Sequence, residues 1–200
     1  LERTKEEIEA FGGVCETAAV DVSSKKEVDE FFDRYLEEQG RLDIFVSNAG
    51  YTEMKSALDT TEREIDGLFG TNYKGALFCL QRAAKQMKQQ RSGNIVIVTS
   101  VNAMNPLPSQ GVYTTTKCAL EGLMRCIAAD LCKYHIRVNT LAPGAVNTNM
   151  NHDMYVDKEV RKKFDQLVPI GHVADIDEMG DVCACMVSDA FRYMTGSTVL

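Results

Sequence analysis

The chain has 200 residues, the size of one domain or at most two small ones, and its 44% hydrophobic and 26% charged residues are typical of a globular protein. Its formal net charge of −7 has the wrong sign for a domain that nucleic-acid phosphates hold in place. No apolar run approaches the roughly 20 residues that span a bilayer, and the first residues form a charged amphipathic stretch rather than a signal sequence. These features exclude a disordered chain and predict a cytoplasmic protein without a nucleic-acid or membrane partner.

The seven cysteines have no regular spacing, and most lie in apolar helical patterns where a free thiol behaves as a small hydrophobic side chain. Cys183 and Cys185 form a Cys-x-Cys pair, but neither a second pair nor a suitably spaced histidine completes a zinc site. We therefore expect no metal site, and the thiols favour a reducing compartment. A redox-active cysteine is the weakest functional hypothesis, because nothing beside the seven cysteines predicts a low thiol pKa.

The pattern of apolar residues and caps in the first quarter of the chain predicts alternating helices and strands. Residues 1–11 are typical of the end of an amphipathic helix that two glycines terminate, and residues 14–22 are typical of a short strand. A serine cap then opens a helix over 25–39, and the apolar residues 44–46 follow as a buried strand.

The rest of the chain continues this alternation. A threonine cap opens a long helical stretch over 61–90, and the later expected elements are a strand over 95–98, a helix over 111–133, a strand over 136–141, an irregular segment over 145–175, a helix over 177–188 and a strand that starts at 196. Apolar strands that alternate with helices specify a parallel sheet covered on both faces, here as a single α/β domain. In such sheets ligands bind beyond the carboxyl ends of the strands.

Tyr113 and Lys117 are four residues apart in a predicted helix, shortly after the strand that ends at Ser100. This spacing places both side chains on one helix face with their polar ends close together. A neighbouring ammonium favours the phenolate and lowers the pKa of a phenol towards neutral, so that Tyr113 can exchange a proton with an alcohol. Taken alone the pattern is weak, because such a pair is more often a packed ring beside a solvated amine.

Further motifs stand around this pair in a fixed order. They are SNAG at 47–50, TNYKG at 71–75, IVTS at 97–100, YTTTK at 113–117 and IRVNTLAPGAVNT at 136–148. Together they resemble the short-chain dehydrogenase/reductase family over nearly the whole chain. The resemblance implies a Rossmann-like, doubly wound parallel sheet. The pattern looks most like that of glucose 1-dehydrogenases, and 3-oxoacyl-carrier-protein reductases share much of it.

By that resemblance, four residues carry a reversible hydride transfer between a secondary alcohol or sugar hydroxyl and NAD or NADP. Tyr113 would be the general acid and base, and Ser100 would hydrogen-bond the reacting oxygen. Lys117 would hold the nicotinamide ribose and lower the pKa of Tyr113, and Asn72 would anchor a water of the proton relay. These roles fit the chemistry, because hydride transfer needs a proton donor or acceptor beside the reacting oxygen.

The resemblance also implies a cofactor site that includes Tyr113 and Lys117. Asp21 and Val22 match the positions that touch the adenine, and the positions that line the cleft or flank the nicotinamide are Asn48, Ala49, Gly50, Pro143, Gly144, Val146 and Thr148. The small-molecule substrate, an alcohol or carbonyl compound, would lie mainly against residues 145–170. The long helices resemble those through which family members assemble, which implies a homo-oligomer, either a tetramer or a dimer.

The sequence departs from the family pattern at its beginning. The glycine-rich phosphate loop between the first strand and the first helix is absent, and Gly12 and Gly13 do not replace it because they follow a helix. In the family's sheet order, the strands at 14–20 and 43–47 would each lack a neighbour. We therefore expect an N-terminally truncated domain, a fragment of a longer chain, that binds the cofactor poorly. The choice between NAD and NADP stays open.

Two rival functions compete with an oxidoreductase. A serine hydrolase would need a Gly-x-Ser-x-Gly nucleophile elbow, which Ser100 lacks. A catalytically silent binding or assembly module would keep the long helices over 61–90 and 111–133 without the phosphate loop. The complete set of Ser100, Tyr113 and Lys117 favours the enzyme.

Overall fold

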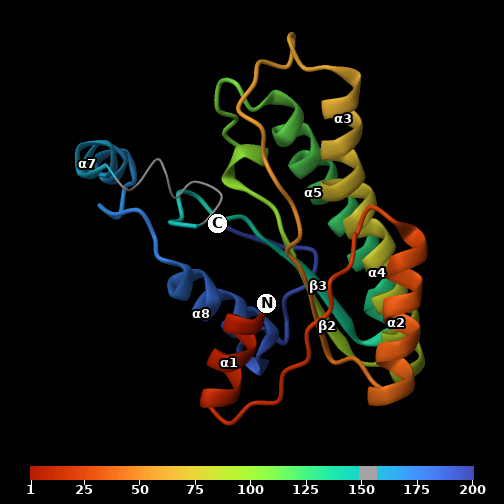
Figure 1. Ribbon diagram of the computed structural model, residues 1–200. Coiled ribbons are helices and arrows are strands. Elements are labelled where there is room, and N and C mark those ends of the chain that lie inside the picture. Colours follow the sequence, from red (N-terminus) through yellow and green to blue (C-terminus); the bar gives the residue numbers. More distant parts are fainter. Residues whose placement is uncertain (149–156) are drawn as a thin grey trace.

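The computed structural model describes residues 1–148 and 157–200, which form a parallel sheet between two layers of helices (Figure 1). The strands lie in the order β1-β2-β3-β4, and each neighbouring pair is parallel. They span Ile44–Ser47 (β1), Gly93–Val98 (β2), Ile136–Leu141 (β3) and Thr198–Val199 (β4). Because all strands run the same way, their carboxyl ends meet at one edge of the sheet. The predicted α/β class with a Rossmann-like parallel sheet is confirmed.

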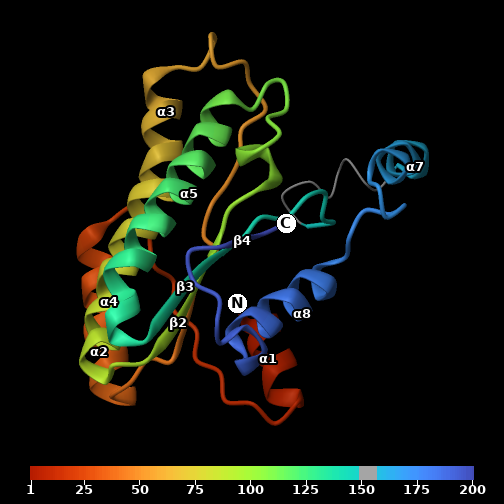
Figure 2. The same ribbon diagram turned by 180° about the vertical axis from the view of Figure 1, so that it is seen from behind.

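Helices cover both faces of this sheet (Figures 1 and 2). Helices α2, α4 and α5 lie on one face, and α1 and α8 lie on the other. The helices of the described residues are α1 (Glu2–Ala10), α2 (Lys25–Gln39), α3 (Glu62–Leu68), α4 (Ala76–Gln90), α5 (Gly111–Leu131), α7 (Lys158–Leu167) and α8 (Ile176–Val187). Within the described part of the chain, no helix combines the length and apolar composition that crossing a bilayer requires.

Strand β2 is buried on both faces, and its side chains alternate between the two helical layers. Ile95 and Ile97 pack into the larger core cluster, to which α2, α4 and α5 contribute. Val96 points the other way and packs with Met186 of α8 in a smaller cluster. This two-sided burial explains why the strand reads as a continuous apolar run rather than an alternating one.

The predicted helix caps are present. The Ser24 side chain accepts a hydrogen bond from the Glu27 backbone N–H at the start of α2. At the start of α3, Thr61 and Glu64 form a capping box in which each side chain accepts from the other residue's backbone N–H. Both caps satisfy donors that the first turn of a helix leaves free. The sequence alone allowed Ser23 or Ser24 and Thr60 or Thr61, and the structure has Ser24 and Thr61 as the caps.

The predicted helix over 61–90 is interrupted. Helix α3 runs into a π-helical turn, η1 (Phe69–Gly75), before α4 begins. A π turn inserts an extra residue into the helical repeat and shifts the side chains that follow it. Here the turn carries Asn72, which is 1% exposed. The apolar spacing of the sequence does not reveal this turn, because both flanking segments keep the periodicity of an α-helix.

The predicted strand over 14–22 is wrong. Residues 13–21 form no strand, and the side chain of Val14 is 95% exposed. A strand needs a hydrogen-bonded neighbour, and no strand of the described residues lies beside this segment. The expected irregular segment over 145–175 contains helix α7, and the part of it at 149–156 lies outside the described residues.

Candidate active site

Helix α5 carries Tyr113 and Lys117 one turn apart, as the spacing predicts. The Lys117 ammonium lies 5.7 Å from the centroid of the Tyr113 ring, and the lysine is only 5% exposed. Its Nζ donates a hydrogen bond of 2.9 Å to the Val98 carbonyl at the end of β2. The lysine therefore joins α5 to the carboxyl edge of the sheet, where a parallel sheet binds its ligands.

Ser100 follows β2 at the same edge. Its side chain is largely buried, and its Oγ accepts a hydrogen bond of 3.1 Å from the Asn102 backbone N–H, which begins a short 3₁₀ turn, η2 (Val101–Ala103). The Ser100 side chain also lies beside the Tyr113 phenol, on whose pKa it acts. Residues of two separate elements, the end of β2 and the start of α5, thus meet in one group.

The protonation of this group differs from the sequence expectation. Burial raises the pKa of Tyr113 above its ordinary value, and the hydrogen bond with Ser100 opposes that rise. Burial lowers the pKa of Lys117 to about 8. The net shift of the Tyr113 pKa is upward because burial of the phenol dominates, and the Lys117 ammonium faces the ring and the Val98 carbonyl. That Lys117 lowers this pKa stays a prediction.

Asn72 connects the π turn to two other segments of the site. Its Oδ1 accepts a hydrogen bond of 3.0 Å from the Tyr51 backbone N–H, and its Nδ2 donates to the Tyr51 carbonyl at 2.9 Å and to Thr116 Oγ1 at 3.1 Å. Both amide hydrogens are therefore engaged with protein partners. A relay water at Asn72 would have to use the second lone pair of Oδ1 or a backbone group.

Gly50 lies against both Asn72 and Lys117. A Cβ atom at this position would come within 3.0 Å of Asn72 Oδ1 and 3.6 Å of Lys117 Nζ. A larger residue would therefore fill the space beside the lysine ammonium, so the glycine keeps this space open. Asn48 and Ala49, which precede it, are exposed and accessible to a ligand.

The segment after β3 approaches Ser100 from the other side. The Pro143 carbonyl accepts a hydrogen bond of 2.9 Å from the Val101 backbone N–H, and Gly144 next to it is exposed. Val146 is 8% exposed and forms an isolated bridge with Ala174, so its side chain belongs to the packing of the protein. Of this predicted set, the structure brings Pro143 and Gly144 to the catalytic group, whereas Thr148 is half-buried farther along the chain.

Asp21 and Val22 lie at the start of α2. The Asp21 carboxylate accepts hydrogen bonds from the backbone and hydroxyl of Ser23, and these bonds hold the pKa of Asp21 below its ordinary value. Val22 packs so closely on Gly75 that a Cβ on the glycine would come within 2.7 Å of Val22 Cγ2. This contact brings Val22 next to the start of α4.

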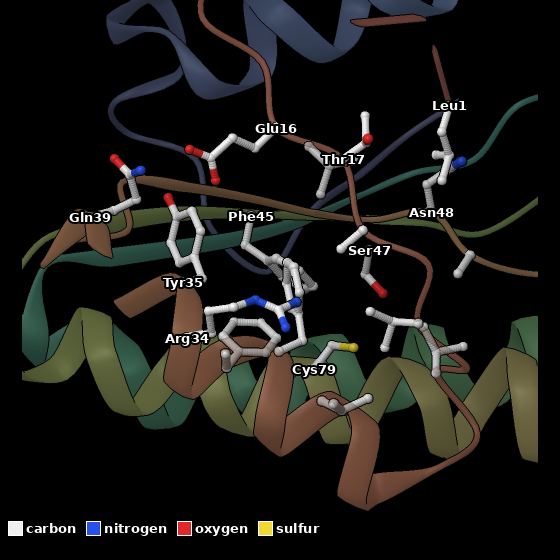
Figure 3. Close-up of a pocket in the computed structure, with 18 of the residues that line it drawn as sticks. Leu1, Glu16, Thr17, Arg34, Tyr35, Gln39, Phe45, Ser47, Asn48 and Cys79 are labelled. Carbon is white, nitrogen blue, oxygen red and sulfur yellow. The ribbon is translucent and has the colours of Figure 1, made fainter. Parts of the chain in front are cut away.

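A cavity of about 740 Å³ opens between α2, β1 and the segment before α2 (Figure 3). Glu16 and Tyr35 lie at one end, and Ser47 and Asn48 lie at the other. Its lining includes three of the predicted cofactor residues, Val22, Asn48 and Ala49, whereas Asp21 is not part of it. The cavity therefore reaches the carboxyl end of β1 from the open edge of the sheet.

The cofactor implied by the sequence resemblance fits these residues only in part. The nicotinamide half has a donor in the Lys117 ammonium and a space kept free by Gly50. The described residues contain no glycine-rich turn between a strand and a helix, which is the usual cradle of a pyrophosphate. Clusters of three or more potential metal ligands are also absent from the described residues.

Sequence reasoning missed Glu121, a carboxylate on α5 that is 4% exposed. It accepts a hydrogen bond of 2.7 Å from the hydroxyl of Thr99, the residue before Ser100. Its spacing provided a signal, because Glu121 follows Lys117 by four residues in a largely apolar stretch and must share its helix face.

A serine after a strand of the parallel sheet, with a tyrosine and a lysine on the neighbouring helix, supplies groups suited to the proton transfer of a dehydrogenase or reductase, and the family comparison agrees. The family model described as Enoyl-(Acyl carrier protein) reductase matches residues 1–200. The chain belongs to this family, which lies within the short-chain dehydrogenases/reductases, and it is an oxidoreductase of that type.

Individual relatives narrow the comparison. The chain is 35% identical over 196 residues to L-rhamnose 1-dehydrogenase (NAD(P)(+)) of Azotobacter vinelandii, covering 98% of this chain and 77% of that protein. It is 30% identical over 198 residues to a 3-oxoacyl-acyl-carrier-protein reductase of Staphylococcus epidermidis, covering 99% of this chain and 80% of the reductase. A crystal structure of NAD+-bound xylitol dehydrogenase superposes with a TM-score of 0.92 at 26% identity, covering 100% of this chain and 82% of the other.

Proposed function

We propose that the protein transfers a hydride reversibly between a sugar hydroxyl or another secondary alcohol and NAD or NADP. The observation that carries this proposal is the position of Tyr113 between the buried Lys117 ammonium and the Ser100 side chain at the end of β2. This group offers a proton donor, a second hydroxyl for the reacting oxygen and a cation within one small volume. General acid–base chemistry at an alcohol or carbonyl needs the first two of these.

The residues divide the work as follows. Tyr113 takes the proton from the alcohol during oxidation and returns it during reduction, while Ser100 hydrogen-bonds the same oxygen. Lys117 donates to the ribose of the cofactor. Its pKa is about 8, so the amine is in its charged form below that pH. The nicotinamide, when bound, accepts or supplies the hydride.

The cofactor would extend from this group along the carboxyl edge of the sheet. Gly50 and the exposed Asn48 and Ala49 would border it, and Pro143, Gly144, Val146 and Thr148 would flank the nicotinamide side. Val22 and Asp21 would lie at the adenine end, which the contact of Val22 with the 740 Å³ cavity supports. Because the described residues supply no phosphate cradle, we expect the 200-residue chain to bind either cofactor weakly.

A sugar is the substrate class we favour. The L-rhamnose 1-dehydrogenases of Azotobacter vinelandii and a Sphingomonas strain, at 35% and 33% identity, support it together with the glucose 1-dehydrogenase pattern of the motifs. The second candidate is reduction of a 3-oxoacyl thioester, which the staphylococcal reductases at 30% and 31% identity support.

The remaining expectations also stay proposals. We propose that residues 1–200 act as one domain that holds both the cofactor and the catalytic segments. A homotetramer or homodimer would form through the long helices, and size-exclusion chromatography with light scattering measures its mass. All seven cysteines are free, which supports the cytoplasmic location we propose.

The test is a panel that follows the absorbance of the reduced nicotinamide. L-Rhamnose, D-glucose and xylitol are offered with NAD+ or NADP+, and a short 3-oxoacyl thioester is offered with NADH or NADPH. We expect turnover with at least one sugar at a high cofactor concentration, and its loss in Tyr113→Phe. Turnover only with the thioester would support the second candidate. A folded chain that turns over none of them at cofactor concentrations shown to saturate it would instead be a silent module.

A further inference from the structure

Glu121 is a buried carboxylate with no part in the proposed hydride transfer. It lies on α5 one turn beyond Lys117, and its side chain is 6% exposed. Each of its oxygens accepts one short hydrogen bond, Oε1 from Thr99 Oγ1 at 2.7 Å and Oε2 from Thr198 Oγ1 at 2.6 Å. Burying a carboxylate is costly unless hydrogen bonds compensate, so these two threonines account for its presence in the core.

The bond to Thr99 fixes the residue directly before Ser100. The Thr99 backbone N–H also donates to the Leu141 carbonyl at 2.8 Å, which ties the end of β2 to β3. The sheet thus sets the register of this strand end, while Glu121 sets its position against α5, the helix that carries Tyr113. Ser100 and Tyr113 come from these two separate elements, so their relative position depends on how the elements are held together.

Two side chains of α5 hold the end of β2. One is Lys117, which donates to the Val98 carbonyl, and the other is Glu121, which accepts from Thr99. The proposed function requires the lysine ammonium to turn part of its donor capacity to the cofactor ribose. Glu121 has no such second task, so its bond can persist through the reaction.

The other oxygen of Glu121 accepts its hydrogen bond from β4 rather than from Thr99. Thr140 on β3 donates a hydrogen bond of 2.8 Å to Thr198 on β4, and Thr198 in turn donates to Glu121. Arg125 approaches the same oxygen at 3.8 Å from an exposed position. The bond at Oε2 therefore joins β4 to α5, whereas the bond at Oε1 holds the residue before Ser100. Removing the bond at Oε2 is thus a matched control for removing the bond at Oε1.

We propose that Glu121 is a positioning residue that holds Thr99 so that the Ser100 hydroxyl stays aligned with Tyr113. The proposal rests on the function proposed above for the kinetic part of its test. The proposal gives the two hydrogen bonds of the carboxylate different roles. The bond from Thr99 supports the catalytic rate, and the bond from Thr198 supports the stability of the fold.

The kinetic test uses variants that remove one bond each. Thr99→Val keeps the shape of the side chain and loses the bond to Oε1, and Thr198→Val does the same for Oε2. We expect Thr99→Val and Glu121→Gln to lower kcat about tenfold with little change in KM, since small misplacements of reacting groups cost rate. Thr198→Val should lower the melting temperature and keep kcat, and Thr99→Ser, which restores the hydroxyl, should recover it. In a Ser100→Ala background, Glu121→Gln should have no further effect on kcat.

A second readout needs no turnover. The Tyr113 phenol is titrated by its ultraviolet difference absorbance, with Tyr113→Phe identifying its share. Because the Ser100 hydrogen bond lowers the pKa of Tyr113, we expect this pKa to rise in Thr99→Val and Glu121→Gln and to stay in Thr198→Val. An unchanged Tyr113 titration in folded Thr99→Val overturns the proposal, and so do equal losses of kcat in both threonine variants. If no substrate is turned over, the titration still decides the role of Glu121.

Discussion

The catalytic end of β2 and the outer edge of β1 are built very differently. At β2, the polar groups are buried and paired: Lys117 with Val98, and Thr99 with Glu121. At β1, Ile44 and Val46 are 47% and 40% exposed, and the segment before α2 forms no strand beside them. The residues assigned to proton transfer therefore belong to a packed region, whereas those assigned to the adenine end border an open cavity.

The proposed reaction has two requirements, correctly placed catalytic side chains and a tightly bound cofactor, and the two regions bear on them separately. The positions of Ser100, Tyr113 and Lys117 depend on contacts among β2, β3 and α5, which the described residues supply. Tight cofactor binding would need a phosphate cradle, which the described residues do not supply. The described residues therefore bear on the positions of the proposed catalytic side chains more than on the hold on the cofactor.

Removing the Tyr113 hydroxyl should have the largest effect. Tyr113→Phe deletes the proton donor and the partner of Ser100 but keeps the packed ring, so we expect kcat to fall about 10³-fold while folding is retained. Initial rates with the best substrate of the panel and far-ultraviolet circular dichroism check both parts. Retention of more than about a tenth of the parent rate would contradict general acid–base catalysis by Tyr113.

Lys117 should make stability depend on pH above neutral. Its pKa is 10.5 when unfolded and about 8 when folded, so between these values the unfolded chain binds a proton that the folded chain has released. The free energy of unfolding should therefore rise with pH over this range, by roughly 3 kcal/mol at most, and should not depend on Lys117 below about pH 8, where both states are protonated.

Lys117→Met should abolish this rise and be more stable than the parent at pH 7. Urea unfolding between pH 7 and 10.5 measures the difference, which cancels the titration of the cysteines and tyrosines common to both chains. Lys85→Met, at an exposed position of α4, is the matched control and should follow the parent. Parallel curves for the parent and Lys117→Met would show that the buried ammonium keeps an ordinary pKa.

Asn72 should contribute to the stability of the fold through its hydrogen bonds to the Tyr51 backbone. Asn72→Ala leaves both backbone groups of Tyr51 without their side-chain partner, so we expect a loss of about 2 kcal/mol in the free energy of unfolding. Gln89→Ala, an exposed position on α4, should change it by less than about 0.5 kcal/mol. Denaturant titration compares the two, and equal small losses would mean that water replaces the amide without cost.

Val46 and Val96 provide the smallest and most direct comparison of the two regions. They are partners in the β1–β2 register, but Val96 is 2% exposed and Val46 is 40% exposed. Val96→Ala should cost about 1.5 kcal/mol, and Val46→Ala less than about 0.5 kcal/mol. Similar losses in urea unfolding at both positions would show that the outer edge of β1 is covered in solution.

Several features of the site follow from local sequence alone. The four-residue spacing of Tyr113 and Lys117 needs only that their segment be a helix, and the caps at Ser24 and Thr61 need only the residues that follow them. The apolar runs that became β2 and β3 indicate buried parallel strands without further context. The run over 44–46 predicts a buried strand in the same way, but Ile44 and Val46 of β1 are exposed. The motif order, and with it the family, can be read in the same way.

Other features depend on residues far apart in the chain. The segment over 14–22 has the composition of a strand, but pairing requires a neighbouring strand that composition does not provide. The direction of the Tyr113 pKa shift is set by burial, against the opposing effect of Ser100, and both act on the phenol only after folding. The role of Glu121 likewise depends on Thr99 and Thr198, from two different strands.

The sequence by itself determined the α/β class and most of the helices and strands, because each rests on periodicity or capping within a few residues. The proposed catalytic group came from the resemblance of ordered motifs to a family. Only the tertiary structure decided the open edge of β1, the π turn at Asn72 and the threonine bonds of Glu121. The physical reason is that hydrogen-bond pairing and burial arise between elements, where the local sequence does not specify which partner an atom meets.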